Sequence, residues 1–391
     1  MVMARRVSLA VVFGGMSICL VACTSKPQTG KPDSGKPDSG KSPAQNTNAG
    51  DTGGSLRRLL MLTNGDDPFW DAMRAGMEDA DRDFKLSEVG LRAELDKNDG
   101  TAKGQVDKLK QYAGQNDIAA VSISVTDSQN VAIHDAMRAL RSQGIEVVTI
   151  DSDVDRKKAG DTRFAYLGTD NIIGGRVLGM AARGLRPQGG KYAAFVGIKS
   201  AANAQERTDG FAEEVGKDFE QLDYLGDEMD LSTAQKNVRD ALDRHAGLNT
   251  LVGIWAYNAH AIAHTVKDRG IRDKMTVVCF DAAPKAIGHM EDGLIDALVV
   301  QNPYQMGYQG TKLMRAIVED DHDTLSQMFP EYEPDERSFK KPGGDILITG
   351  LKVVVPDGDK RLTKEIFEGK AELLTLSEFK DWLVKYKLSG S

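Results

Sequence analysis

The sequence predicts an α/β protein built from two doubly wound lobes, and three observations carry this prediction. From Arg57 onward, short apolar runs alternate with longer amphipathic stretches, which is the pattern of a parallel sheet covered by helices on both faces. The alternation runs through once and starts again near Arg163. The chain has 391 residues, and the patterned part is long enough for two domains of roughly 150 residues.

Each half of the pattern divides into expected strands and helices. In the first half, strands are expected at 57–63, 91–96, 118–124 and 145–151, with helices near 68–86, 101–115 and 129–143. In the second half, strands are expected at 163–169, 191–197, 250–256, 275–281 and 295–301, with helices from about 171, near 203–217 and near 258–269.

The N-terminal segment has the features of an export signal followed by a tether. Arg5 and Arg6 precede an apolar stretch, residues 7–22, that is too short for a comfortable membrane span, as in a secretory signal peptide. The stretch ends in Leu-Val-Ala-Cys, which resembles the bacterial lipobox and implies cleavage after residue 22 and lipid attachment at Cys23. Residues 23–56 contain a duplicated Gly-Lys-Pro-Asp-Ser and predict a disordered, membrane-anchored linker.

Charge and cysteine content exclude several functions. The formal net charge is −8, which disfavours the phosphate contacts of a nucleic-acid-binding protein. Cys279 lies within an apolar run and is expected to be a buried hydrophobe without chemistry. Gly174 and Gly175 lack the G-x-G-x-x-G frame of a nucleotide turn, so we expect close helix packing there and predict no cofactor.

Polar side chains follow most of the expected strands. Taken singly, each fits a helix N-cap, but the carboxyl ends of parallel strands meet at one edge of a sheet, where ligands bind. Together with Arg207, carboxylates, amides and hydroxyls make a set suited to holding the hydroxyl groups of a ligand. The set comprises Asn64, Asp66, Asp67, Ser124, Asp127, Asp151, Ser152, Asp170, Asn171, Asn258, Asp281 and Gln301.

Several motifs, in order, resemble the type I periplasmic binding proteins, and within them the ribose-binding group, over roughly residues 59–308. They are NGDDPFWDAMRAG, VSISVTDS, VVTIDSD, YLGTDNIIGGR, NAQERTDGF, WAYNAHA, VVCFDAAP and VVQNPYQMGYQG. The resemblance implies two Rossmann-like lobes joined by a multi-strand hinge. It gives a first lobe of residues 57–168 and 302–330, and a second lobe of 169–301 and 331–391 that includes a C-terminal extension.

The resemblance also implies a function and a site. The expected function is that of the extracytoplasmic component of an ABC transporter, a monomer without enzymatic activity that binds a monosaccharide between its lobes and delivers it to a membrane permease. Aromatic faces would pack on the sugar ring while charged groups hold its hydroxyls. The implied ligand-binding residues are Asp67, Phe69, Trp70, Ser124, Asp151, Arg207, Asn258, Asp281 and Gln301.

Two departures from the ribose-binding pattern leave the sugar open. Ser152 stands where ribose binders have a second arginine, and the second-lobe aromatic residue is replaced, on this alignment, by Asp230. Trp255 or Tyr257 could supply the missing aromatic face, although Trp255 has the spacing of a core residue. The segment SEFKDWLVKY, residues 377–386, predicts an added amphipathic helix of unassigned role.

Other interpretations remain open from sequence alone. A sugar-sensing receptor subunit would use the same site, and a polyol or a furanosyl signal molecule could replace the sugar. A lipid-anchored glycosidase would need two poised carboxylates flanking a sugar bond. His260 and His264 are four residues apart but have no third metal ligand at suitable spacing, and the acidic run 320–323 fits a solvated loop better than a cation site, so we predict no metal.

Overall fold

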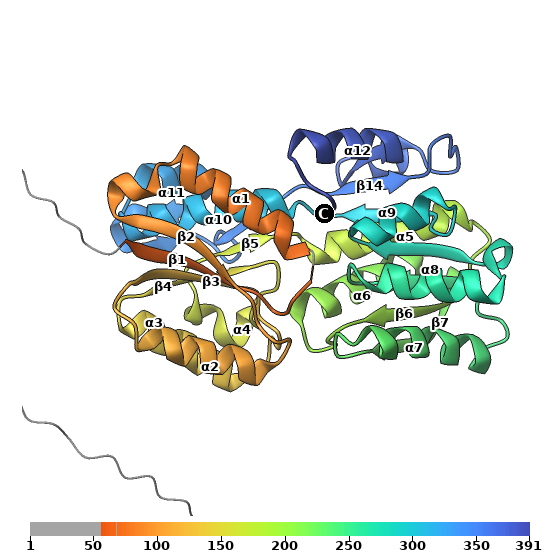
Figure 1. The fold of residues 1–391 in the computed structure, drawn as a ribbon, viewed down its shortest axis with the longest axis horizontal. Helices are drawn as coiled ribbons and strands as arrows, with labels where there is room; N and C mark the ends of the chain where they lie inside the picture. The colour runs from red at the N-terminus through yellow and green to blue at the C-terminus, as the bar shows by residue number, and fades with distance from the viewer. Residues whose placement is uncertain (1–55, 68) are drawn as a thin grey trace, which may run out of the picture. The chain divides into compact units, whose positions relative to one another are not determined.

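A computed structural model describes residues 56–67 and 69–391 (Figure 1). The expected signal peptide, the lipid-carrying Cys23 and the linker up to residue 55 lie outside these residues. The described part of the chain forms two lobes, each a twisted sheet with helices on both faces (Figure 1), which is the predicted fold class.

The first lobe contains a six-stranded sheet in the order β13-β5-β4-β3-β1-β2, with all neighbouring strands parallel. Helices α2, α3 and α4 cover one face, and α1, α10 and α11 cover the other. The strands are β1 (Arg57–Leu62), β2 (Leu91–Asp96), β3 (Ile118–Ile123), β4 (Glu146–Ile150), β5 (Tyr166–Gly168) and β13 (Ile346–Ile348). The helices are α1 (Phe69–Asp83), α2 (Ala102–Ala113), α3 (Val131–Ser142), α4 (Arg156–Ala159), α10 (Pro303–Val318) and α11 (His322–Met328).

The second lobe contains a seven-stranded sheet in the order β15-β14-β10-β9-β8-β6-β7, in which only the β10–β14 pair is antiparallel. Helices α5 and α6 pack on one face, and α7, α8, α9 and α12 pack on the other. The strands are β6 (Gly190–Val196), β7 (Phe219–Gly226), β8 (Thr250–Gly253), β9 (Thr276–Phe280), β10 (Ala297–Val300), β14 (Lys352–Val355) and β15 (Glu372–Thr375). The helices are α5 (Asn171–Leu185), α6 (Ala202–Val215), α7 (Leu231–Arg244), α8 (Asn258–Arg269), α9 (Pro284–Glu291) and α12 (Leu376–Lys385).

The chain crosses between the lobes three times. The crossings follow β5, β10 and β13, and each joins a strand of one lobe to a helix or strand of the other. Three short segments that run between two rigid lobes form a hinge about which the lobes can rotate. The predicted multi-strand hinge therefore corresponds to these crossings.

The third crossing differs from the sequence prediction. Residues 331–391 are expected in the second lobe. Instead β13 pairs with β5 at the edge of the first sheet, and the chain passes to the second sheet only at Lys352. The small hairpin of β11 (Tyr332–Glu333) and β12 (Ser338–Phe339) also packs against Phe164 of the first lobe. Residues 332–348 thus complete the first lobe because its edge strand β5 needs a partner.

Helices α5 and α6 approach each other unusually closely. A Cβ atom placed on Gly175 would lie 2.1 Å from the carbonyl oxygen of Arg207, so only glycine permits this contact. Close packing at this helix, expected for Gly174 and Gly175, is confirmed; a Cβ atom placed on Gly174 would lie 2.8 Å from Cζ of Phe280 in β9. The contact at Gly175 also fixes the backbone that carries Arg207 into the cleft.

The predicted C-terminal helix is present as α12. Its Leu376, Phe379 and Leu383 are buried against the second lobe. The chain then turns back, and the backbone of Ser391 exchanges hydrogen bonds with that of Ala282.

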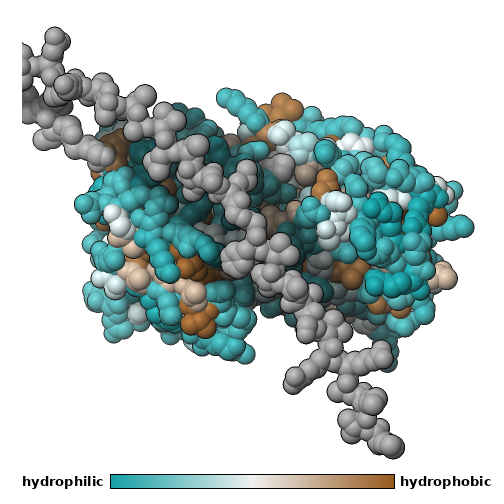
Figure 2. All heavy atoms as spheres, turned by 60° about the horizontal axis from the view of Figure 1, so that its bottom comes forward, coloured by the Kyte–Doolittle hydropathy of each residue, from teal (hydrophilic) through white to brown (hydrophobic). Residues whose placement is uncertain are grey.

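The surface is mostly hydrophilic on the face shown in Figure 2, where apolar residues form small separate groups. Within residues 56–67 and 69–391, no helix has the length and apolar character needed to cross a bilayer.

Candidate functional site

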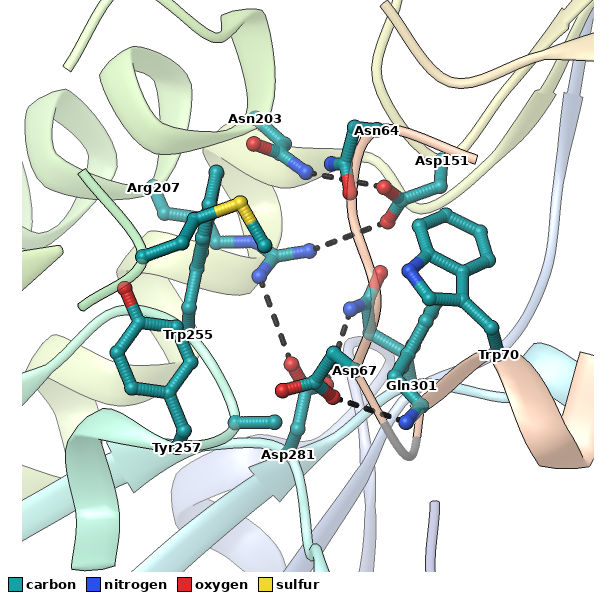
Figure 3. A pocket seen from close by; sticks show the side chains of 13 residues that line it. Asn64, Asp67, Trp70, Asp151, Asn203, Arg207, Trp255, Tyr257, Asp281 and Gln301 are labelled. Atoms are coloured by element: carbon teal, nitrogen blue, oxygen red, sulfur yellow. Dashed lines mark hydrogen bonds and ion pairs between the residues drawn. The ribbon is translucent and has the colours of Figure 1, made fainter. Parts of the chain in front are cut away.

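A pocket between the two lobes brings most of the predicted site residues together (Figure 3). The space between its side chains that protein atoms leave free is about 370 Å³, part of which is open to solvent. Seven of the nine predicted residues line it: Asp67, Phe69, Trp70, Asp151, Arg207, Asp281 and Gln301. The other lining residues are Asn64, Asn203, Met229, Trp255, Ala256 and Tyr257.

Two carboxylates enter the pocket from corresponding strand ends. Asp151 directly follows β4, Asp281 directly follows β9, and both have a φ of 63°, a conformation that aspartate tolerates better than most residues. Ser124 Oγ and Asn203 Nδ2 donate hydrogen bonds to Asp151 Oδ2 over 2.9 and 3.2 Å. Gln301 Nε2 donates to Asp281 Oδ1 over 2.9 Å. Both carboxylates are therefore oriented before any ligand contacts them.

Arg207 lies between these two carboxylates (Figure 3). Its guanidinium nitrogens are 3.8 Å from the nearest oxygens of Asp151 and Asp281. Nε donates to Asn171 Oδ1, Nη1 donates to the carbonyl oxygen of Ile254, and the guanidinium stacks 4.1 Å from the Phe280 ring centroid. Nη2 is buried and has no hydrogen-bond partner among the described residues. This atom is a fixed donor that a ligand oxygen could accept from.

Burial dominates the electrostatics of the pocket. It raises the pKa of Asp281 to about 7, against the opposing effect of Arg207. Burial also raises the pKa of Asp151 and of Asp67 above their ordinary values. Asp151 and Asp281 share one guanidinium, so their ionised forms are not fully compensated by Arg207. Ligand hydroxyls that donate hydrogen bonds would stabilise the carboxylate forms.

Aromatic rings supply the apolar walls. Phe69 and Trp70 begin α1 and contact each other edge to face, with ring centroids 5.0 Å apart. Trp255 and Tyr257 enter from the second lobe. Trp255 also packs in the core, as its spacing predicted, and its buried Nε1 has no hydrogen-bond partner among residues of the described chain. Such rings can pack on the C–H face of a sugar, while the indole N–H of a tryptophan donates a hydrogen bond to a sugar oxygen.

Two predicted residues lie behind the pocket. Ser124 is fully buried and contacts Asp151. Asn258 accepts the backbone N–H of Trp255 at Oδ1 and donates through Nδ2 to Asp227 Oδ2, each over 3.0 Å. Both side chains hold lining residues in position and do not line the pocket themselves.

The prediction that Asp230 replaces the second-lobe aromatic is wrong by one residue. Asp230 is exposed, and its Oδ1 accepts the backbone N–H of Thr233 over 2.6 Å as the N-cap of α7. Met229 lines the pocket instead. The sequence signal that could have identified Met229 is the N-cap role of Asp230. An aspartate that caps a helix turns its side chain toward that helix, so the preceding residue is left to face the cleft.

Ser152, at the place of the second arginine of ribose binders, is also buried and does not line the pocket. Its Oγ donates to the carbonyl oxygen of Val125 over 2.9 Å. Asn203, which the sequence did not single out, spans the cleft from α6 to Asp151. It takes part in holding the two lobes together.

Other candidate groups have structural surroundings. His260 Nδ1 lies 2.8 Å from His289 Nε2, and burial lowers the pKa of His260 to about 4. In the acidic run 320–323, Asp321 caps α11. Over the described ranges, no group of three or more metal-binding side chains is arranged around a common point. Cys279 is buried, and burial raises the pKa of its thiol to about 12.

The fold and this cleft are those of a two-lobed binding protein, and residues 59–322 match the periplasmic binding protein domain. The chain belongs to that family and has the type I fold. It is 27% identical over 263 residues to the D-allose-binding periplasmic protein of Escherichia coli, covering 66% of this chain and 81% of the relative. It is 26% identical to the ribose import binding protein of Salmonella typhimurium, covering 49% of this chain and 62% of that protein.

Solved structures agree with the fold. An ABC transporter solute-binding protein from Burkholderia graminis, in complex with D-arabinose, superposes with a TM-score of 0.65 at 21% identity. The superposition covers 79% of this chain and 98% of that one. A glucose-galactose binding protein from Geobacillus stearothermophilus gives a TM-score of 0.63 at 23% identity, covering 77% and 97% of the two chains.

Proposed function

We propose that this protein is the extracytoplasmic sugar-binding component of an ABC transporter. It binds a monosaccharide, a pentose or a hexose, between its lobes and delivers it to a membrane permease. The observation that carries the proposal is the pocket in which Asp151 and Asp281 flank Arg207 beneath aromatic walls. Few ligands other than a small polyhydroxylated ring offer both hydroxyl donors for carboxylates and a C–H face for aromatic rings.

The polar groups of the pocket match the two hydrogen-bonding roles of a sugar. Carboxylate oxygens accept from hydroxyl groups, while Arg207 Nη2 and Trp255 Nε1, which lack partners among the described residues, donate to hydroxyl or ring oxygens. A hydrogen bond to a charged group contributes roughly 1.5–3 kcal/mol. A few such bonds select one arrangement of hydroxyls around the ring.

Ligand binding and lobe closure are coupled in this proposal. Asp67 and Asp151 belong to the first lobe, whereas Arg207 and Asp281 belong to the second. A sugar that contacts both lobes favours the closed arrangement over an open one by its differential affinity. The permease would then recognise the surface that the two closed lobes form together.

Relatives and the N-terminal sequence support the cellular setting. The named relatives are a D-allose-binding protein and ribose import binding proteins. Export and lipid attachment at Cys23 would keep the binding protein, as a monomer, near the membrane in which its permease lies, with a reach set by the linker 24–56.

The test is a thermal-shift screen of the purified protein against pentoses, hexoses, polyols and nucleosides. A ligand that binds only the folded state raises the free energy of unfolding by about 2.7 kcal/mol at 100 times its Kd. We expect a large shift with one or a few monosaccharides. Shifts only with nucleosides or other non-sugar compounds would leave the fold in place and refute the proposed substrate.

The same screen separates binding from catalysis. We expect the sugar to be recovered unchanged and aryl glycosides to release no product. Product formed in proportion to protein, and abolished in Asp281→Asn, would instead identify a glycosidase.

A further inference from the structure

Met229 crosses the cleft and lies against two glycines of the first lobe, Gly65 and Gly100. It lies in the loop between β7 and α7 and lines the pocket. A Cβ atom placed on Gly65 would lie 2.2 Å from Met229 Cε and 2.8 Å from its Sδ, and one on Gly100 would lie 3.3 Å from Sδ. The thioether therefore fills the space that a side chain at position 65 would need.

The loop that carries Met229 is held in an uncommon conformation. Glu228 and Met229 have φ values of 51° and 65°, in the left-handed region that non-glycine residues rarely adopt. The Met229 N–H donates to Asp227 Oδ1 over 3.0 Å, and the same carboxylate accepts from Tyr257 Oη and Asn258 Nδ2. Backbone strain of this kind persists where the surroundings determine it, often at ligand-binding sites. The Asp227 carboxylate thus holds the backbone from which the Met229 side chain extends.

We infer that Met229 determines the size of ligand that the pocket accepts. Its thioether closes one side of the pocket against Gly65 and Gly100, so a single sugar ring fits and a ring with a bulky substituent on that side does not. The same contact joins the lobes, so the size limit applies only when the lobes are closed. This inference rests on the proposed sugar-binding function and names the residue that would restrict it to monosaccharides.

The side chain of methionine suits this role. It is unbranched and polarizable and adapts its shape to an irregular apolar gap. The aromatic rings of Trp255 and Tyr257 are held by the core and by Asp227 respectively, whereas Met229 is half-buried and packs between lobes. Met229 also packs against the core of the second lobe, so shortening it would enlarge the pocket toward the first lobe at some cost in stability, which the unfolding curves measure.

The first arm of the test is a double-mutant cycle between positions 65 and 229. The backbone of Gly65 is outside the left-handed region, and apart from Met229 its added Cβ would meet only Gly100 Cα, at 3.8 Å. Alanine at position 65 therefore has to displace the flexible end of the Met229 side chain. For the sugar that gives the largest shift, we expect Gly65→Ala to weaken binding about tenfold and Met229→Ala to restore most of that loss in the double variant.

The second arm measures the range of ligands. We expect Met229→Ala to bind methyl glycosides or disaccharides of the same sugar at least about tenfold more tightly than the natural protein does. Met229→Leu conserves side-chain volume and should retain the natural preference for the unsubstituted sugar. Isothermal titration calorimetry on the full protein measures both arms.

Gly160→Ala is the matched control, because Gly160 is in the first lobe, has a φ of −57° and would meet nothing within 4 Å. It should bind as the natural protein does. Unfolding curves without sugar show whether each variant is folded. If Gly65→Ala does not fold, the double variant with Met229→Ala tests the same contact, because removing the thioether should allow the protein to fold again.

The outcomes separate this inference from the proposed function. If the natural protein binds no sugar, the proposed function fails and the inference fails with it. If it binds a sugar but the losses at positions 65 and 229 simply add, and Met229→Ala keeps the natural ligand range, the inference alone is overturned.

Discussion

Asp151 and Asp281 occupy equivalent positions in the two lobes. Each is the first residue after the fourth strand of its lobe, each has a φ of 63°, and each lies 3.8 Å from the guanidinium of Arg207. One arginine from the second lobe thus faces a carboxylate from each half of a repeated architecture. Closure of the cleft therefore brings Asp151 of the first lobe close to Arg207 and Asp281 of the second lobe.

Replacing either aspartate by asparagine should weaken sugar binding. Loss of a hydrogen bond to a charged group costs about 1.5–3 kcal/mol, or roughly 10- to 150-fold in Kd, and asparagine preserves side-chain size. Titration calorimetry with the sugar found by screening measures the change. Asp230→Asn is the control, since Asp230 is an exposed helix cap and asparagine caps equally well. Equal affinities for all three variants would contradict the assigned site.

The stability of the sugar-free protein should fall as pH rises from about 4 to 7, because the buried carboxyl groups with raised pKa values together outweigh His260, whose lowered pKa of about 4 acts in the opposite direction. Burial raises the pKa of Asp281 from 3.8 to about 7, so in this window the folded state holds a proton that the unfolded state has released. Stability then decreases with rising pH, and this contribution levels off outside the window. Urea unfolding at several pH values measures the slope.

Asp281→Asn should make that slope shallower without removing it. Burial also raises the pKa values of Asp151 and Asp67, and it raises that of Asp227 to about 6, so these groups continue to contribute. An unchanged slope in the variant would show that Asp281 does not titrate in this range.

Gly175→Ala should destabilise the second lobe and weaken sugar binding together. The new Cβ would lie 2.1 Å from the carbonyl oxygen of Arg207, so α5 and α6 must separate and Arg207 must shift. Overpacking of this kind costs about 1–3 kcal/mol. Gly288→Ala, also in a helix but with nothing within 4 Å of the added Cβ, should stabilise by about 0.5–1 kcal/mol. Urea unfolding that showed the same change in both variants would refute the close contact.

Asp153→Ala should destabilise the first lobe strongly. Asp153 and Arg163 form a bidentate pair with both N–O distances at 2.8 Å, and their side chains are only 2% and 1% exposed. Removing one partner of a buried pair costs about 3–5 kcal/mol. By contrast, Asp240→Ala removes an exposed pair with Lys236 and should change stability by less than about 1 kcal/mol, as measured by urea unfolding. Similar losses in the two variants would contradict this account.

Most strand ends were predictable from sequence because buried parallel strands are continuous apolar runs. Asp151, Asp281 and Gln301 follow such runs, so their convergence in one pocket could be anticipated. Phe69 and Trp70 came from the family resemblance, which also assigned Arg207 its ligand-binding role. The edge strand β7 was not anticipated, because its residues are largely half-buried or exposed and it gives no apolar run.

The remaining differences arose from local backbone geometry. Met229 points into the cleft because of two consecutive left-handed residues, which leave no periodic signal in the sequence. The separation of β13 from β14 depends on which sheet edge is free to accept a strand, and that is a property of the assembled lobes. Ser124 and Asn258 were placed at the right strand ends, but sequence could not show that they face the lining residues rather than the cleft.

The third crossing has a consequence for synthesis and export. The first sheet receives its edge strand at residues 346–348, and the second receives β14 and β15 at residues 352–355 and 372–375. A nascent chain that has reached residue 330 therefore contains neither sheet in finished form. Both lobes can complete folding only after residues 346–375 have been made. During most of its synthesis the chain therefore remains incompletely folded, which is the state that passage through an export channel would require.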